Sequence, residues 1–324
     1  MKNLALDLAP AEFVGVNVRE KKFVNVKDRY MFPIELFDSA SISQIRHIQL
    51  SCVSFRPPSP FRGFPNLRKL DLYLFDASEM DLDEMLSGCS NLEWLSFYKC
   101  DVNDELKVKQ PLYRLLYLRI AHCNITKVVL CAENLKTFVY HGGRLPIDLG
   151  QVKQLETAKL RLYGITFEYV LNELPDFLRG VQNLTFQTSY LPLVFSVFQK
   201  PLLLENIGSF PQLRFLRLTL LVRYCDNENI LSLASFLKAA PLIEELEMHL
   251  SKESAFTGFN GIKGQREFLL HIVENAPAMK VLTIDPKKRL GLCNGKPADF
   301  FACRASVRRE LKGKLSPGAE VNIL

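Results

Sequence analysis

The 324-residue sequence lacks any long run of apolar residues. Its longest apolar stretch, residues 191–198, is interrupted by Pro192 and is far shorter than the ~20 residues that a membrane-spanning helix requires. The first eight residues also lack the character of a secretory signal, because Asp7 interrupts them and their leucines alternate as in a strand. We therefore expect no membrane association and a location in the cytoplasm, the nucleus or both.

The cysteine spacing is not that of a disulfide scaffold or a zinc site. The eight cysteines include no C-x-x-C pair, which favours a reducing compartment and thiols that are buried for structural reasons. His122 and Cys123 are adjacent, but no second pair stands at zinc-ligand spacing. We expect no bound metal and no cofactor.

Motifs that carry catalysis are also missing. The sequence has no G-x-x-x-x-G-K-[ST], no G-x-G-x-x-G, no H-E-x-x-H and no G-x-S-x-G. The glycine-rich segment 258–264 lacks the lysine and hydroxyl of a phosphate-binding loop, so it predicts a plain loop. Glu245, Glu247 and His249 indicate an acidic contact patch rather than an acid–base pair. We do not expect the protein to be an enzyme.

Positive charge is concentrated near the C-terminus. The net charge is +6, and residues 280–314 hold ten Lys and Arg against three Asp and Glu, so the rest of the chain is nearly neutral. Nucleic-acid binding is not expected, since it usually needs such charge aligned along a groove or interleaved with aromatic residues. Pro286–Arg289 could serve as a nuclear address, although a solvated loop explains the same four residues.

What the sequence does contain is a short repeated pattern of three aliphatic or aromatic residues, spaced L-x-x-L-x-L. Early copies begin 20 to 25 residues apart, and later copies begin 30 or more residues apart. A period in the twenties with this spacing is typical of leucine-rich repeats. The copies are Ile45/Ile48/Leu50, Leu67/Leu70/Leu72, Leu92/Leu95/Phe97, Leu115/Leu118/Ile120, Leu135/Phe138/Tyr140, Val181/Leu184/Phe186, Leu213/Leu216/Leu218, Ile243/Leu246/Met248 and Met279/Leu282/Ile284.

The pattern predicts an α/β leucine-rich repeat solenoid, right-handed, with a parallel concave sheet and a helical or irregular convex side. We assign residues 1–250 to the repeats and residues 251–324 to a C-terminal repeat and cap, continuous with the solenoid. Helical return segments are expected between Met80 and Gly88 and over the ranges 168–180, 227–240, 265–275 and 300–311.

Strand alternation sends a cluster of aromatic residues onto the concave side. Tyr73 is expected beside Tyr98, and Trp94, the only tryptophan, beside Tyr117 and Arg119. Trp, Tyr and Arg are the residue types that dominate binding energy at protein interfaces. These five residues are the candidate protein-binding patch. The alternative is that the rings merely cover one another, or lie beneath N-terminal structure supplied from elsewhere.

Two parts of the sequence resemble a known family. Residues 64–72 (FPNLRKLDL) and 86–95 (LSGCSNLEWL) resemble plant F-box/LRR proteins, and residues 267–284 are similar to the FBD-type segment of that family. The resemblance implies that the repeats recognise a protein destined for ubiquitination. In that family a separate N-terminal F-box docks on the Skp–cullin ligase core. Residues 174–178 look like the start of an F-box, but they run directly into an expected strand.

We therefore predict a protein-binding leucine-rich repeat protein that resembles the substrate-recognition region of an SCF-type ubiquitin ligase subunit. Its partner would be a protein target, and a Skp-type adaptor is expected only if an F-box is supplied upstream. The alternative is an orphan repeat scaffold, or a partial gene product, with no ligase coupling. Leucines 4, 6 and 8 already follow the strand pattern, which favours a missing N-terminal portion because solenoid ends need caps.

Overall fold

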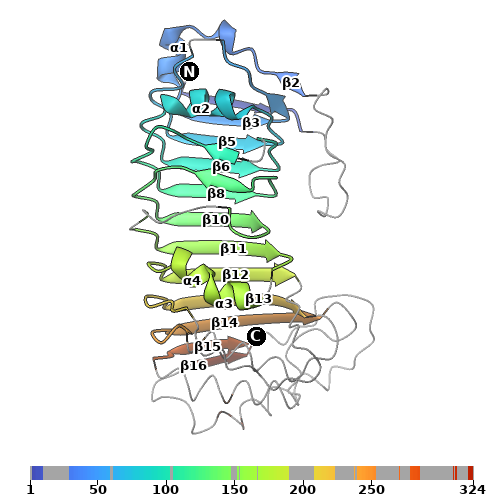
Figure 1. Ribbon diagram of the computed structural model, residues 1–324, viewed down its shortest axis with the longest axis vertical. Coiled ribbons are helices and arrows are strands. Elements are labelled where there is room, and N and C mark those ends of the chain that lie inside the picture. Colours follow the sequence, from blue (N-terminus) through green and yellow to red (C-terminus); the bar gives the residue numbers. More distant parts are fainter. Residues whose placement is uncertain are drawn as a thin grey trace. The chain divides into compact units, whose positions relative to one another are not determined.

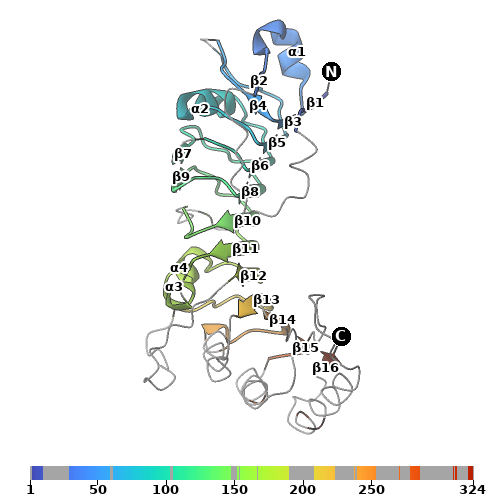
Figure 2. The same cartoon turned by 90° about the vertical axis from the view of Figure 1, so that its right-hand side faces the viewer.

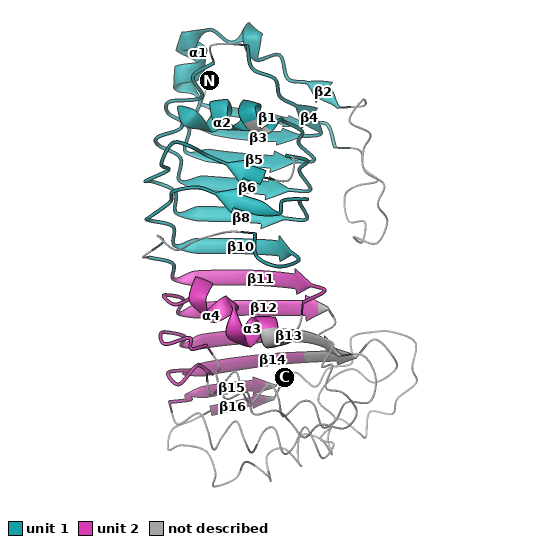
Figure 3. Ribbon diagram, viewed as in Figure 1, with its two compact units in different colours: residues 1–155 teal, residues 156–324 magenta. Residues whose placement is uncertain are grey.

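The computed structural model forms two compact units, residues 1–155 and 156–324, which are described separately (Figure 3). Described are residues 2–9, 29–58, 61–102, 105–146, 152, 154–165, 167–189, 208–222, 237, 239–252, 270, 278–284, 309, 311 and 320–323. The expected helices at 227–240, 265–275 and 300–311 lie almost entirely outside these residues, and the loop 258–264 and Pro286–Arg289 do so completely. The domain division at residue 250 stays a prediction.

In unit 1 the repeated triplets form a parallel ladder of strands that follow one another in chain order (Figure 1). Equivalent triplet positions pair across the ladder, so that Leu70 is the register partner of Leu95, and Leu95 is the partner of Leu118. The inward residues of neighbouring strands therefore bury one another. The strands are β1 (Asn3–Asp7), β3 (His47–Ser51), β5 (Lys69–Tyr73), β6 (Trp94–Tyr98), β8 (Tyr117–Ala121) and β10 (Thr137–Gly142).

Unit 2 repeats the arrangement with its own parallel ladder. Leu184 pairs with Leu216, which in turn pairs with Leu246, and all three are almost fully buried. The strands are β11 (Thr157–Tyr163), β12 (Asn183–Ser189), β13 (Phe215–Val222), β14 (Glu245–Lys252), β15 (Val281–Ile284) and β16 (Glu320–Ile323). The two ladders confirm the leucine-rich repeat architecture expected from the sequence.

Strand β11 is a repeat that the aliphatic pattern did not reveal. Its triplet is Leu155/Ala158/Leu160, with alanine at the middle position. Ala158 is completely buried and pairs with Leu184 of β12. The apparent gap in the pattern between residues 140 and 181 is therefore a repeat with a small residue in its core.

The return path of unit 1 is largely extended, with one helix at the place expected from the sequence, in agreement with a convex side that is partly helical and partly irregular. Its short strands pair in parallel, as the main ladder does. Figure 2 shows that α2, β7 and β9 lie on one face of the unit 1 ladder. The elements are β2 (Tyr30–Met31), η3 (Ile34–Leu36), α1 (Ser39–Gln44), β4 (Val53–Ser54), α2 (Glu79–Ser87), β7 (Glu105–Lys107) and β9 (Lys127–Val129).

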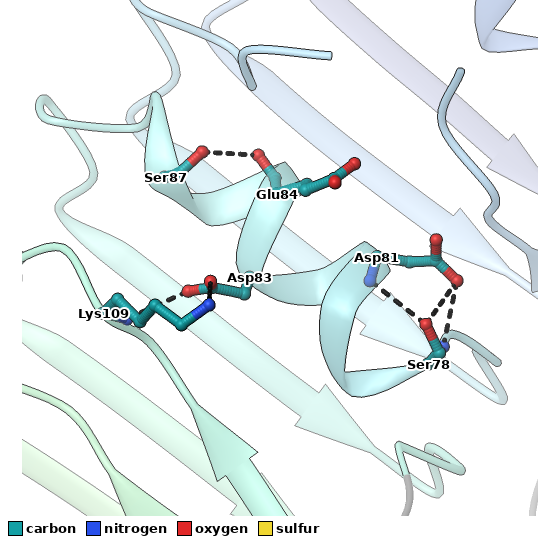
Figure 4. A network of polar contacts seen from close by, with 6 residues as sticks. All are labelled: Ser78, Asp81, Asp83, Glu84, Ser87 and Lys109. Atoms are coloured by element: carbon teal, nitrogen blue, oxygen red, sulfur yellow. Dashed lines mark hydrogen bonds and ion pairs between the residues drawn. The ribbon is translucent and has the colours of Figure 1, made fainter. Parts of the chain in front are cut away.

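Helix α2 begins at a reciprocal cap and is tied to the next repeat (Figure 4). Ser78 Oγ accepts a hydrogen bond from the Asp81 backbone N–H at 3.1 Å, while Asp81 accepts one from the Ser78 N–H, so two free donors of the first turn are satisfied. Asp83 at the middle of α2 accepts the Lys109 backbone N–H at 2.9 Å. Its other oxygen lies 3.0 Å from Lys109 Nζ.

The buried face of α2 differs from the one expected. Met80 is 74% exposed, whereas Leu82 joins Met85 and Leu86 in the core. The helix ends at Gly88, as expected, but the reason is close packing. A Cβ at Gly88 would overlap the Arg62 carbonyl, so only glycine fits this crossing of two backbones.

In unit 2 the return segment before β12 is helical but broken. Helix α3 (Phe167–Asn172) is followed by α4 (Leu174–Phe177), which has Pro175 in its first turn, where the missing N–H of proline costs nothing. Residues 174–178, which resemble the start of an F-box, are thus the connection into β12. The structure supports the interpretation that they belong to a repeat.

A left-handed residue follows four strands of unit 1 and turns the chain out of the sheet. Cys52, Leu74, Lys99 and His122 have φ between 49° and 57°. Such values are uncommon for residues other than glycine and cost roughly 1 kcal/mol each. The residues that directly follow Leu74, Lys99 and His122 are Phe75, Cys100 and Cys123, respectively. In two of the four turns the left-handed residue is followed directly by a cysteine, and in a third it is itself Cys52.

Asparagine side chains cross-link the repeats of unit 1. Asn66, Asn91 and Asn134 each precede the first leucine of a triplet. Their amide groups donate to the carbonyls of Ser43, Pro65 and Tyr113 at 2.7 to 2.9 Å, and these carbonyls belong to the preceding repeat. Neighbouring repeats are thus joined at their strand entrances as well as along the ladder.

One buried ion pair joins Arg29 to Asp76 in unit 1. Arg29 Nη1 lies 3.1 Å from Asp76 Oδ1, and the arginine side chain is 2% exposed. Asp76 also bridges in parallel to Ser54 on one side and Asp101 on the other. A buried guanidinium without its carboxylate costs several kcal/mol, so Asp76 is needed to keep Arg29 buried directly before β2.

We predict that Asp76→Ala lowers the free energy of unfolding by about 3 kcal/mol, because Arg29 stays buried without a partner. Urea denaturation measures the change. The exposed pair Asp176–Arg179 supplies the control, and Asp176→Ala should cost less than about 1 kcal/mol. Adding Arg29→Met to Asp76→Ala should recover most of the loss. Equal effects of the two single aspartate variants would contradict the prediction.

Candidate protein-binding site

The ladder of unit 1 brings the five candidate residues together on the face opposite α2, which we call the open face. Tyr73 pairs in register with Tyr98, and Trp94 with Tyr117. Arg119 lies two residues after Tyr117 on β8 and pairs in register with Ser96. The five residues Tyr73, Trp94, Tyr98, Tyr117 and Arg119 are called the aromatic patch from here on.

Trp94 is held rigidly within the patch. Its ring stacks on Tyr117 with centroids 3.4 Å apart and an interplanar angle of 6°, and Nε1 donates to Asp71 Oδ1 at 2.8 Å. Lys69 Nζ lies 4.9 Å from the Trp94 ring centroid and 3.0 Å from Asp71 Oδ2. Both faces and the N–H of the indole therefore have partners.

Tyr98 is the centre of the second half of the patch. It stacks with Tyr73 at 5.3 Å between centroids, and the edge of His122 meets it at 5.3 Å. The guanidinium carbon of Arg119 lies 4.8 Å from the Tyr98 centroid, and Lys99 Nζ lies 5.8 Å from it. Two cations thus flank a single ring.

Burial raises the pKa of two phenols of the patch above its ordinary value. It raises the pKa of Tyr117, an effect that Arg119 opposes and Asp71 reinforces. Burial also raises the pKa of Tyr73, helped by neighbouring Tyr98 and Asp7. Both hydroxyls are neutral at physiological pH even without this shift, and they can donate as well as accept hydrogen bonds.

All five side chains of the patch are partly exposed. The rings do cover one another, as the alternative interpretation held, yet each retains accessible surface. Ser96 alternates with Leu95 and Phe97 along β6 and so lies on the open face between Trp94 and Tyr98, yet it is only 5% exposed. The patch is therefore a pre-formed surface whose stacked side chains are partly buried against one another.

The acidic contact patch expected on β14 is largely neutralised. Glu247 accepts from Arg217 Nε at 2.6 Å and lies 2.6 Å from His249 Nε2. Glu244, just before the strand, contacts Arg214 and Lys280 at 3.1 and 2.6 Å. Burial of Glu247 works to raise its pKa, but hydrogen bonds from His249 and Arg217 prevail and lower it. The open face of unit 2 thus carries paired charges here.

The described cysteines are mostly core residues. Cys52, Cys89 and Cys100 are buried, while Cys123 and Cys131 are partly accessible. Burial raises the pKa of the Cys89 thiol to about 12, so it is protonated and inert. No group of three or more His, Cys, Asp or Glu suited to a metal ion occurs among the described residues.

The stacked strands, the buried triplets and the exposed in-between residues define a leucine-rich repeat protein. The family described as "At1g61320/AtMIF1, LRR domain" matches residues 14–256, so the chain belongs to this family of leucine-rich repeat domains. Domains of this class are typically non-catalytic modules that bind proteins. The match covers a leucine-rich repeat domain and ends before residues 267–284, so it gives no evidence for an F-box or an FBD segment. No curated protein matches the chain.

In the part of the chain that the structure describes, no helix combines the length and the apolar character needed to cross a bilayer.

We predict that Glu247→Gln destabilises unit 2 by about 1 kcal/mol or less at neutral pH, because Arg217 remains largely solvated. The lowered pKa means that the carboxylate stabilises the fold above its unfolded pKa, and that this contribution is lost as the pH falls through the folded pKa. Urea denaturation of both proteins from about pH 6 to about pH 3 should show the difference shrinking. Arg217→Met should weaken the same pH dependence. A difference that is constant with pH would contradict the assignment.

Proposed function

We propose that the protein binds another protein through the aromatic patch on the open face of unit 1. The observation that carries the proposal is a rigid cluster of one tryptophan, three tyrosines and one arginine, partly exposed on a sheet face. Clusters of these residue types, packed and pre-organised, are where interface energy concentrates. Because the rings are already ordered by stacking, binding loses little side-chain entropy. Membership in a family of leucine-rich repeat domains supports a protein as the partner.

Trp94→Ala and Tyr117→Ala should each weaken partner binding about tenfold or more. They should lower the unfolding free energy by no more than about 2 kcal/mol, because both rings are only partly buried. Partners captured on the immobilised full chain and quantified by mass spectrometry, together with urea denaturation, provide both measurements.

Two controls separate binding from folding. Tyr113→Ala removes an exposed ring outside the patch and should leave binding unchanged. Leu95→Ala empties a core position between Trp94 and Ser96 and should cost about 3 kcal/mol or more. If the patch variants lost as much stability as Leu95→Ala, the rings would be core residues and the proposal would fail.

Coupling to a ubiquitin ligase is the finer proposal, and it rests on the sequence motifs alone. Residues 64–72, 86–95 and 267–284 resemble F-box/LRR and FBD-type segments, and in those proteins the repeats select the substrate. In this proposal an upstream F-box, rather than the repeats, would contact the Skp adaptor. An orphan repeat scaffold that binds the same target without a ligase is the alternative.

The repeats alone, as residues 1–324, should not retain a purified Skp adaptor on a column. A fusion that carries the F-box encoded upstream in the same reading frame should retain it and should promote ubiquitination of the captured target. Absence of an in-frame F-box, or failure of the fusion to bind the adaptor, would contradict coupling to a ligase and favour the orphan scaffold. Adaptor binding by the repeats themselves would contradict both the proposal of an upstream F-box and the orphan-scaffold alternative.

A further inference from the structure

The aromatic patch contains a cation that no described residue neutralises. No carboxylate among the described residues lies within ion-pair distance of the Arg119 guanidinium, whose contact is the face of Tyr98 at 4.8 Å. Its register partners are Ser96 on β6 and Val139 on β10, and both are buried. Arg119 therefore has no acidic register neighbour, and an added carboxylate would meet no competing acid there.

The nearest acid along this row of the ladder is already engaged. Asp71 on β5 pairs in register with Ser96, which separates it from Arg119 by one strand. Its two oxygens are taken by Trp94 Nε1 at 2.8 Å and Lys69 Nζ at 3.0 Å. Lys69 and Asp71 thus cancel, while Arg119 and Lys99 leave the surface around Tyr98 positive.

The stacking also orients Arg119. A guanidinium that lies over a ring presents its N–H groups at its edge, and such donors match a carboxylate in a bidentate arrangement. Tyr117 precedes Arg119 by two residues on the same strand and so lies about 6.7 Å away along it. An extended peptide that runs along β8 has the same spacing between alternate side chains.

From this geometry we propose that the patch recognises an extended acidic segment of the partner, in which an Asp or Glu binds Arg119 and an apolar or aromatic side chain two residues away packs on Trp94 and Tyr117. The inference rests on the proposed function and specifies its partner. Five residues make only the centre of an interface, since stable complexes bury roughly 800 Å² on each partner. A short peptide should therefore bind weakly, and its affinity should fall as salt screens the exposed cations.

A random peptide library displayed on phage and selected on the full chain supplies the probe. We expect enrichment of Asp or Glu two residues from an aromatic or aliphatic residue. A synthetic peptide of that consensus, followed by fluorescence anisotropy, should lose about tenfold or more in affinity with Arg119→Gln. The peptide with Asn or Gln at the acidic position should lose a similar amount, and combining both changes should add little more. Arg161→Gln, which removes an arginine over Tyr163 in unit 2, is the matched control and should have no effect.

The possible failures are distinct. Peptides that depend on Trp94 but show no acidic preference would overturn this inference and leave the proposed function intact. Selected peptides that ignore Trp94, Tyr117 and Arg119 alike would overturn both. A consensus peptide that binds through Arg119 only with phosphoserine in place of the acid would also overturn the inference, in favour of a phosphorylated partner.

Discussion

The structure depends on the mutual burial of aliphatic triplets on neighbouring parallel strands. A single strand of this kind exposes its leucines on one side, and only a neighbour in the same register can cover them. A shift by one residue would move every leucine to the solvent side. The register is reinforced outside the strands, where asparagine amides at positions 66, 91 and 134 bond to the preceding repeat. Once this register is set, the identity of the open face follows from the residues between the leucines.

The same constraint explains why the aromatic patch is rigid. In-register pairing places Trp94 directly beside Tyr117, and Tyr73 beside Tyr98, so rings from different repeats stack without any added framework. The indole N–H is satisfied by Asp71, which in turn is neutralised by Lys69. The indole N–H and the Asp71 carboxylate are thereby satisfied within the cluster, whereas no described carboxylate neutralises Arg119. The proposed recognition surface is thus a consequence of the regular core beneath it.

Much of this could be predicted from the sequence, because the period of the triplets determines both the fold and the outward face of each strand. The five patch residues are brought together as the alternation implied, although their role in binding remains a proposal. The errors have local causes. Ala158 is a small core residue that a search for large aliphatic residues does not find. Met80 stands five residues before Met85, about 140° from it around the helix, whereas Leu82 has the spacing that places it on the buried face with Met85 and Leu86. The neutralisation of Glu247 required knowledge of which strand lies beside β14, which spacing along the chain does not contain.

The ladder fixes the register of the strands but not the length of the segments between them, and this affects how such a chain can change over evolution. Each strand must align its triplet with that of its neighbour, but nothing in that requirement fixes how many residues join one triplet to the next. Triplets begin 22 to 25 residues apart from Ile45 to Leu115, yet Leu213 follows Val181 by 32 residues and Met279 follows Ile243 by 36. Lengthening a connection adds only a slowly growing entropy of closure. Insertions can accordingly accumulate in the segments between strands while the sheet stays intact. The strands and the segments that connect them are therefore free to diverge at different rates.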